Sequence, residues 1–312
     1  MEMEFMKFFH NMAYDFRRNK ALLVMVLPIV VYLLVFAYAP MFGAIIAFKS
    51  YNFSLGILGS PWVGFNNFRF FFMSGKAWQV TKNTVLYNAA FIITQNVLEI
   101  TVAIFLSEIT GRYFKKFTQG AMFLPNFISW VVVGAIAYNL FSYDFGFINN
   151  MLTAAGSPKL DVYTNASYWP YIFIFLSAWK HVGYGSIVYL AAITGISSEI
   201  YESASLDGAN EWQKIIYITL PGIKSTFFVL LILAIGNIFR GNFDMFYQLV
   251  GNNGLLYNST DVIDTYVFRS LLTTYEFGMS SAIGLYQSVL CFVTLVVTNL
   301  IIRKLSPENA LY

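Results

Sequence analysis

Several charged and amide side chains lie inside long apolar stretches of the sequence, where they could bind a polar solute. On a helix with about 100° per residue, four of them fall within about 60° of one another: Asn237, Gly241, Asp244 and Gln248. Arg240 lies to one side of this stripe, four residues before Asp244, at a spacing that allows an ion pair. Polar side chains in apolar helices either line a path for solutes or bond neighbouring helices.

Two other apolar stretches carry similar residues, and together they predict a path for a polar solute. The candidates for lining it are Asn88, Gln95, Glu99, Lys180, Tyr184, Asn237, Arg240 and Asp244. Because lysine and arginine pair with carboxylates, Lys180 and Arg240 suggest a more specific hypothesis, that the solute is acidic, which for a sugar would mean a uronate. The structural alternative is that each of these residues only bonds neighbouring helices.

The composition shows what surrounds these residues. Of the 312 residues, 58% are hydrophobic and only 11% are charged, whereas a soluble domain carries about 25% charged residues. These values exclude a disordered chain, a nucleic-acid-binding domain and an ordinary soluble enzyme. A single cysteine, Cys291, and two distant histidines, His10 and His181, argue against a disulfide framework and a metal site. The remaining class is an all-α, multi-pass membrane protein.

A helix of about 20 apolar residues crosses a bilayer, and the sequence predicts six such spans. They are residues 21–48, 83–108, 117–141, 168–194, 223–248 and 280–303, within a transmembrane domain at 21–303. Lys and Arg mark the cytoplasmic side. They are dense in the tail at 1–20, in the loops near Arg112 and Lys214, and at Arg303 and Lys304, where the tail at 304–312 begins. Both termini are therefore predicted to be cytoplasmic, with no cleaved signal peptide.

The predicted cytoplasmic loop at 195–222 has the local signals of a helix, a turn and a second helix. Ser197 or Ser198 can cap the first helix, and Gly208 suits the left-handed residue that ends it. Asn210 and Gln213 have the spacing of a capping box for the second helix. Small residues leave the surface of the first helix shallow, which favours docking against another protein.

The same loop resembles the signature of the permease subunits of binding-protein-dependent ABC importers, which has the form E-A-A, three residues, G, nine residues, I-x-L-P. The matching positions are Glu202, Ser203, Ala204, Gly208, Ile218, Leu220 and Pro221, with Ser203 as the one departure. Asp207-Gly208-Ala209 is similar to the form common in sugar permeases. Leu27-Pro28, the segment 42–51 and the segment 63–68 also look like carbohydrate-uptake permeases, most closely those for oligosaccharides or polysaccharide fragments.

This resemblance implies a type I importer permease in the bacterial cytoplasmic (inner) membrane. The loop at 198–221 would be the coupling helix, which docks on a separate ATPase through Glu202, Ser203, Ala204, Asp207, Gly208, Ala209, Ile218, Leu220 and Pro221. The implied partners are a second permease subunit of different sequence, two cytoplasmic ATPase subunits and an extracellular or periplasmic sugar-binding protein. The chain lacks a G-x-x-x-x-G-K-[ST] phosphate loop, so no cofactor is expected on it, and ATP and Mg are expected on the ATPase.

Three alternatives remain open at this stage. An ABC permease for a non-sugar solute would carry the same loop. A secondary sugar transporter could use Glu99 or Asp244 as a proton site, although such proteins often show inverted repeats, which the sequence lacks. A membrane enzyme would need a cluster of carboxylates, and only Asp261 and Asp264 come close, with no accompanying motif.

Overall fold

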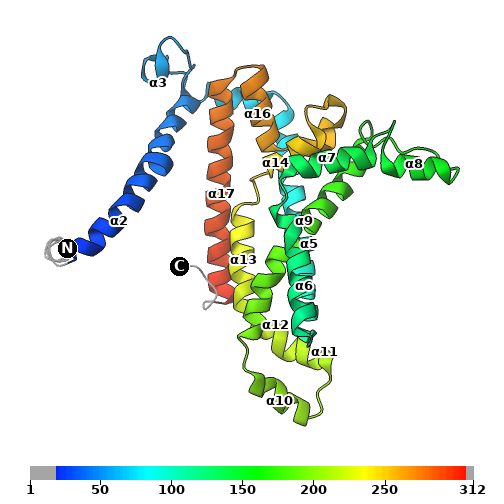
Figure 1. The fold of residues 1–312 in the computed structure, drawn as a ribbon. Helices are drawn as coiled ribbons and strands as arrows, with labels where there is room; N and C mark the ends of the chain where they lie inside the picture. The colour runs from blue at the N-terminus through cyan, green and yellow to red at the C-terminus, as the bar shows by residue number, and fades with distance from the viewer. Residues whose placement is uncertain (1–18, 307–312) are drawn as a thin grey trace.

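The computed structural model describes residues 19–306, most of which are helical. Among these residues no strand forms, apart from an isolated bridge between Lys49 and Trp62, so the all-α prediction is confirmed for this part of the chain. Figure 1 shows long helices running along a common direction, with α7 and α8 lying across one end. The predicted tails at 1–20 and 304–312 lie mostly outside the described residues.

The longest helices form the body of the protein: α5 (Lys76–Glu108), α6 (Arg112–Phe123), α9 (Trp169–Thr194), α13 (Lys224–Gly236) and α17 (Phe277–Leu305). The shorter helices are α3 (Gly56–Gly59), α4 (Asn66–Met73), η3 (Leu124–Phe127), α7 (Trp130–Phe141), α8 (Phe147–Ala154), η4 (Ala166–Tyr168), α10 (Ser198–Leu206), α11 (Glu211–Lys214), η5 (Ile215–Thr219), α12 (Leu220–Gly222), α14 (Phe243–Val250), η6 (Gly254–Leu256), α15 (Tyr257–Thr260) and α16 (Ile263–Thr273).

The centre of the bundle is the pair α5 and α9, which pack along much of their length. Glycines on α9 let its neighbours approach closely. Gly183 lies against the backbone of Met122 on α6, and Gly185 lies against the Glu99 side chain on α5. Beyond these contacts, an aromatic cluster that includes Tyr87 and Phe173 fills the end of the bundle where α14 crosses.

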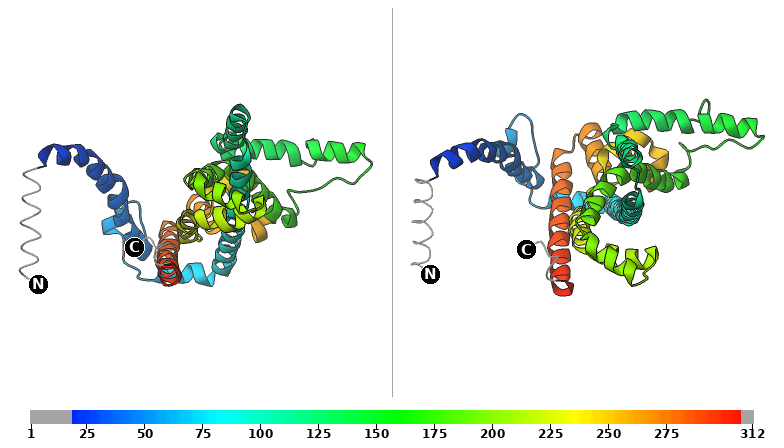
Figure 2. Two further views of the ribbon diagram at one scale, coloured as in Figure 1. Left: turned by 90° about the horizontal axis from the view of Figure 1, so that it is seen from below. Right: turned by 60° about the horizontal axis from the view of Figure 1, so that its bottom comes forward.

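The first apolar segment consists of α2 (Lys20–Leu33), the π-helix η1 (Leu34–Tyr38) and the 3-10 helix η2 (Ala39–Phe48). It stands apart from this body over α2 and meets it only at its end, where η2 packs against α17. All three views show α2 away from the other helices (Figures 1 and 2), and its most apolar stretch buries nothing against them. Such an apolar surface has to be covered by lipid or by another protein chain.

Three described helices are long and apolar enough to cross a membrane: Lys20–Phe48, Lys76–Glu108 and Phe277–Lys304. Two more candidates are bent pairs, Arg112–Phe127 with Trp130–Phe141 at 93° and Glu211–Gly222 with Lys224–Gly236 at 57°. α9 has 26 residues but does not reach the same apolarity.

The prediction of one continuous helix is therefore wrong at 117–141 and at 223–248, and the sequence explains both breaks. In the first, Pro125 lacks an N–H and disfavours helical backbone before it, and Ser129 then caps α7. In the second, α13 ends at Gly236, residues 237–242 are not helical, and Asn242 caps α14. The polar stripe predicted from 237 to 248 does not lie on one helix.

The close approach at Gly183 gives a test of this packing. A Cβ there would collide with the Met122 carbonyl, and overpacking costs about 1–3 kcal/mol, so Gly183→Ala should lower the melting temperature of the purified protein in detergent. Gly284→Ala on α17 is the control, because nothing lies within 4 Å of a Cβ at that position. Equal melting temperatures for the two variants would contradict the α6–α9 contact.

Candidate functional site

The loop between α9 and α13 folds as its local signals predict. Ser197 caps α10 by accepting a hydrogen bond from the Glu199 N–H at 3.3 Å. Gly208 has a φ of +80°, the left-handed conformation that favours glycine. The capping box is confirmed, since the Asn210 and Gln213 side chains bond each other's backbone N–H at 2.9 and 2.8 Å.

The loop presents α10 at one end of the bundle, away from the other helices (Figure 1). Glu202, Ser203 and Asp207 are exposed, as is Leu206, at 89% of its surface. A hollow of about 340 Å³ opens between α10 and the following helices, lined by Ala204, Asp207, Gly208, Ala209, Gln213, Lys214, Tyr217 and Ile218. Exposed apolar and acidic groups beside a hollow form a surface suited to a protein partner.

A hydrogen bond ties this surface to the segment that enters the bundle. The hydroxyls of Tyr201 on α10 and Thr219 on η5 lie 2.9 Å apart. Thr219 is buried, whereas Leu220 and Pro221 that follow it are exposed. Ile223, directly before α13, is 1% exposed. This hydrogen bond and the buried Ile223 side chain connect α10 to the start of α13.

Lys180 lies against the break between α6 and α7. Its ammonium donates to the backbone carbonyls of Pro125 (3.2 Å), Asn126 (3.0 Å) and Ile128, and it lies over the Trp130 ring, 5.4 Å from the centroid. An ammonium has three donors, and these contacts use all of them. The structure thus argues against Lys180 as a receptor for a sugar carboxylate.

The break between α13 and α14 is held from three neighbouring helices. Asn88 Nδ2 on α5 donates to the carbonyls of Ile238 (3.0 Å) and Arg240 (2.9 Å). Gln287 Nε2 on α17 donates to the carbonyl of Phe239 at 2.7 Å. The polar candidate Asn88 thus bonds the backbone of the unwound segment.

The third holder of this break is Asp264 on α16, which the sequence reasoning missed as a site residue. Asp264 Oδ2 accepts from the Gly241 N–H at 2.6 Å and from Gln287 Nε2 at 2.9 Å. Gly241 is required, because a Cβ there would lie 2.7 Å from that oxygen. The available signal was the pair of glycine–asparagine steps, Gly236–Asn237 and Gly241–Asn242, which are typical of a helix end and a new N-cap.

The remaining candidates do not converge on one point. Gln95 donates to Ser177 at 2.9 Å, and Asn237 donates to its own helix at Leu233. Glu99 packs on Gly185, and the exposed Tyr184 ring stacks on Phe123. Arg240 and Asp244 are both exposed, and within residues 19–306 no ion pair joins them, because the break at 237–242 removes their helical register.

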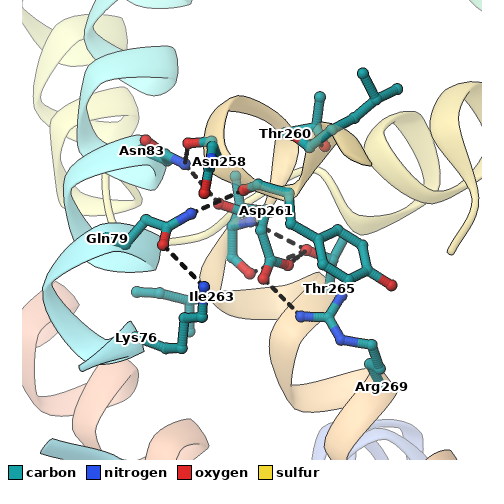
Figure 3. A network of polar contacts seen from close by, with 12 residues as sticks. Lys76, Gln79, Asn83, Asn258, Thr260, Asp261, Ile263, Thr265 and Arg269 are labelled. Atoms are coloured by element: carbon teal, nitrogen blue, oxygen red, sulfur yellow. Dashed lines mark hydrogen bonds and ion pairs between the residues drawn. The ribbon is translucent and has the colours of Figure 1, made fainter. Parts of the chain in front are cut away.

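The segment that follows α14 is fastened to α5 by a polar network (Figure 3). Asn83 donates to the carbonyls of Asn258 and Asp261. The Asp261 carboxylate, which is 2% exposed, accepts from Arg269 at 2.6 Å and from Thr265 at 2.8 Å. Burial acts to lower the pKa of Arg269, but the hydrogen bond and charge of Asp261 outweigh it, and the pKa is raised. The ion pair thus stabilises the segment that carries Asp264.

The class of the protein follows from its fold, this loop and its relatives. Residues 99–307 match the family described as "Binding-protein-dependent transport system inner membrane component". The chain belongs to this family, so it is a transport permease subunit and not an enzyme.

Across the described residues, no three His, Cys, Asp or Glu side chains are grouped so that they could hold a metal ion.

Several known proteins are similar over nearly the whole chain. The polygalacturonan/rhamnogalacturonan transport system permease protein YteP of Bacillus subtilis (strain 168) is 34% identical, over 94% of this chain and 90% of that protein. Protein LplB of the same strain is 33% identical, over 94% and 92%. A chain from the crystal structure of a bacterial ABC transporter involved in the import of the acidic polysaccharide alginate superposes with a TM-score of 0.86 at 32% identity, covering 95% of this chain and 99% of that one.

The contacts of Lys180 predict that Lys180→Met lowers stability. The change keeps the length of the side chain but leaves three backbone carbonyls without a donor, at about 1–3 kcal/mol for each that stays buried. The melting temperature in detergent should fall, whereas Lys82→Met, at an exposed position near the N-terminus of α5, should leave it unchanged. An unchanged melting temperature combined with lost solute uptake would instead place Lys180 in the solute path.

Proposed function

We propose that this chain is one of two permease subunits of an ATP-driven importer that takes up oligosaccharides or polysaccharide fragments. Similarity over nearly the full length to permeases and importers named for polygalacturonan/rhamnogalacturonan and alginate supports the sugar assignment. The observation that carries the transport mechanism is the loop at 198–221, with α10 exposed at the end of the bundle. ATP and Mg act on separate ATPase chains in this proposal.

The proposed topology has six spans with both termini in the cytoplasm. Five segments are candidate membrane spans by length and apolarity. We add α9 as the sixth span, because it packs against both α5 and α6 in the bundle. Arg112 at the start of α6, Lys214 beside the loop and Arg303 at the end of α17 are basic residues of the kind that mark the cytoplasmic side. The loop and the end of α17 lie at the same end of the bundle (Figure 1).

In the proposed mechanism α10 docks on one of two ATPases, and closure of the ATPases moves α10 and, through η5 and α12, α13. The second permease, of different sequence, provides the other wall of the path and the other coupling loop. A periplasmic or extracellular sugar-binding protein delivers the solute, as supported by the alginate transporter structure solved in complex with alginate pentasaccharide-bound periplasmic protein. The resulting complex lies in the bacterial cytoplasmic membrane.

Uptake by the reconstituted complex tests this function. Proteoliposomes that contain both permeases, the ATPases and the binding protein should accumulate an oligosaccharide such as trigalacturonate only when ATP is supplied. Uptake that is driven by a proton gradient without ATP would contradict the proposal and favour a secondary transporter. ATP-driven uptake of only a non-sugar solute would overturn the substrate class but keep the mechanism.

The coupling assignment predicts that Glu202→Lys and Gly208→Leu uncouple ATP hydrolysis from transport. The first reverses a charge on the exposed face of α10, and the second places a β-carbon at a φ of +80°, which costs about 1–2 kcal/mol. We expect uptake to fall by at least tenfold while membrane insertion is unchanged. Glu108→Lys, on the exposed cytoplasmic end of α5, is the control, and wild-type uptake in both loop variants would refute the assignment.

A further inference from the structure

In the proposed topology, the unwound segment at 237–242 lies within the hydrocarbon core of the bilayer, where no water is available. α13 has 13 residues, which at 1.5 Å each give about 20 Å, compared with about 30 Å for the hydrocarbon core. In the proposed topology the segment therefore lies in the outer third of the membrane. Irregular backbone at such depth is tolerated only where it is buried in protein or lines a water-filled cavity.

The backbone of this segment has hydrogen-bond partners, but the side chain of Arg240 has none among the described residues. Asn88, Gln287 and Asp264 hold the backbone on three sides. The Arg240 side chain is exposed on the isolated subunit, and no hydrogen bond or ion pair to it is formed by residues 19–306. Because a guanidinium is always charged and a charge does not face hydrocarbon, Arg240 faces an aqueous path or another subunit, or its side chain extends to the outer headgroups.

The neighbouring charges leave Arg240 available for an external acceptor. Asp264 lies within electrostatic reach of Arg240, but its Oδ2 already accepts from Gly241 and Gln287. Asp244 begins α14, where the helix N-terminus favours a negative charge. The ammonium of Lys180, the other candidate cation, donates to three backbone carbonyls. Arg240 therefore differs from Lys180 in having its donors free.

We infer that Arg240 is a specificity-determining residue that receives a carboxylate of the transported oligosaccharide, and that the solute therefore contains uronic acid. This inference rests on the proposed function. A neutral sugar needs no fixed cation, whereas a guanidinium matches a carboxylate with two parallel hydrogen bonds. Asn88, Gln287 and Asp264 act as positioning residues, because they fix the backbone from which Arg240 projects.

A pair of substrates that differ only in charge tests the inference. ATP-driven uptake of trigalacturonate and of its methyl ester is measured in the reconstituted complex, with binding protein saturated by each ligand. Arg240→Gln should lower the kcat/KM for trigalacturonate by about tenfold to a hundredfold, as expected for loss of a charge-assisted hydrogen bond, and change that for the ester by less than about threefold. Arg240→Lys should restore a large part of the acid uptake.

The control is Lys82→Gln, which removes a positive charge from the exposed outer end of α5 and should leave the ratio of acid to ester uptake unchanged. Equal losses for both substrates in Arg240→Gln would show that Arg240 pairs with the partner permease, and would overturn the inference. Unchanged uptake of trigalacturonate by Arg240→Gln would also overturn the inference. Import of only the ester by the wild type would overturn it too, and in both cases ATP-driven sugar import would still stand. If the wild type imports neither trigalacturonate nor its ester but imports a neutral oligosaccharide with ATP, the inference is overturned and the proposed function stands; if it imports no oligosaccharide with ATP, the proposed function falls as well.

Discussion

Backbone carbonyls that lose their helical partners inside a bilayer must find other donors, because no water replaces them there. In the proposed topology the fold depends on how two such breaks are satisfied. Beside the break at 124–129, the ammonium of Lys180 donates to three carbonyls. At the break at 237–242, the amides of Asn88 and Gln287 donate to the freed carbonyls. Side chains from intact helices thus hold the broken ones in a defined shape.

These two breaks shape the end of the bundle opposite the loop at 195–222. α7 turns by 93° relative to the segment before it and lies across the end of the bundle, where it packs on α14. The two short helices are therefore joined to each other and fastened to α5 and α17 by polar side chains. A break held this way is rigid, which is what a residue such as Arg240 needs if it is to select one solute from others.

The helix α13 connects the two functional regions. Its first residues follow Ile223, which is buried at the end of the coupling loop, and its last residue, Gly236, opens the segment that carries Arg240. In the proposed mechanism, a movement imposed on α10 reaches the solute path through this single helix of 13 residues. The hydrogen bond between Tyr201 and Thr219 keeps the loop joined to that helix.

Local signals in the sequence were enough to predict the caps at Ser197 and Asn210 and the left-handed Gly208, since these depend on residues three or fewer positions apart. The helical wheel failed at 237–248 because it assumed an unbroken helix, although Gly236 and Gly241 marked its ends. Lys180 was assigned to the solute path because its charge was visible and its three carbonyl partners, more than 50 residues away, were not. The hydrogen bonds that join Asp264 and Gln287 to the segment at 237–242 link residues far apart in the sequence, so a local sequence pattern does not predict them.

The most direct test is a structure, by electron cryo-microscopy, of the assembled importer with trigalacturonate trapped in the path. We predict a sugar carboxylate within hydrogen-bond distance of the Arg240 guanidinium, with the Lys180 ammonium still bound to the carbonyls of the first break. A structure in which Arg240 contacts an acidic residue of the second permease, and the sugar is bound elsewhere, would contradict the claim that Arg240 receives the sugar carboxylate.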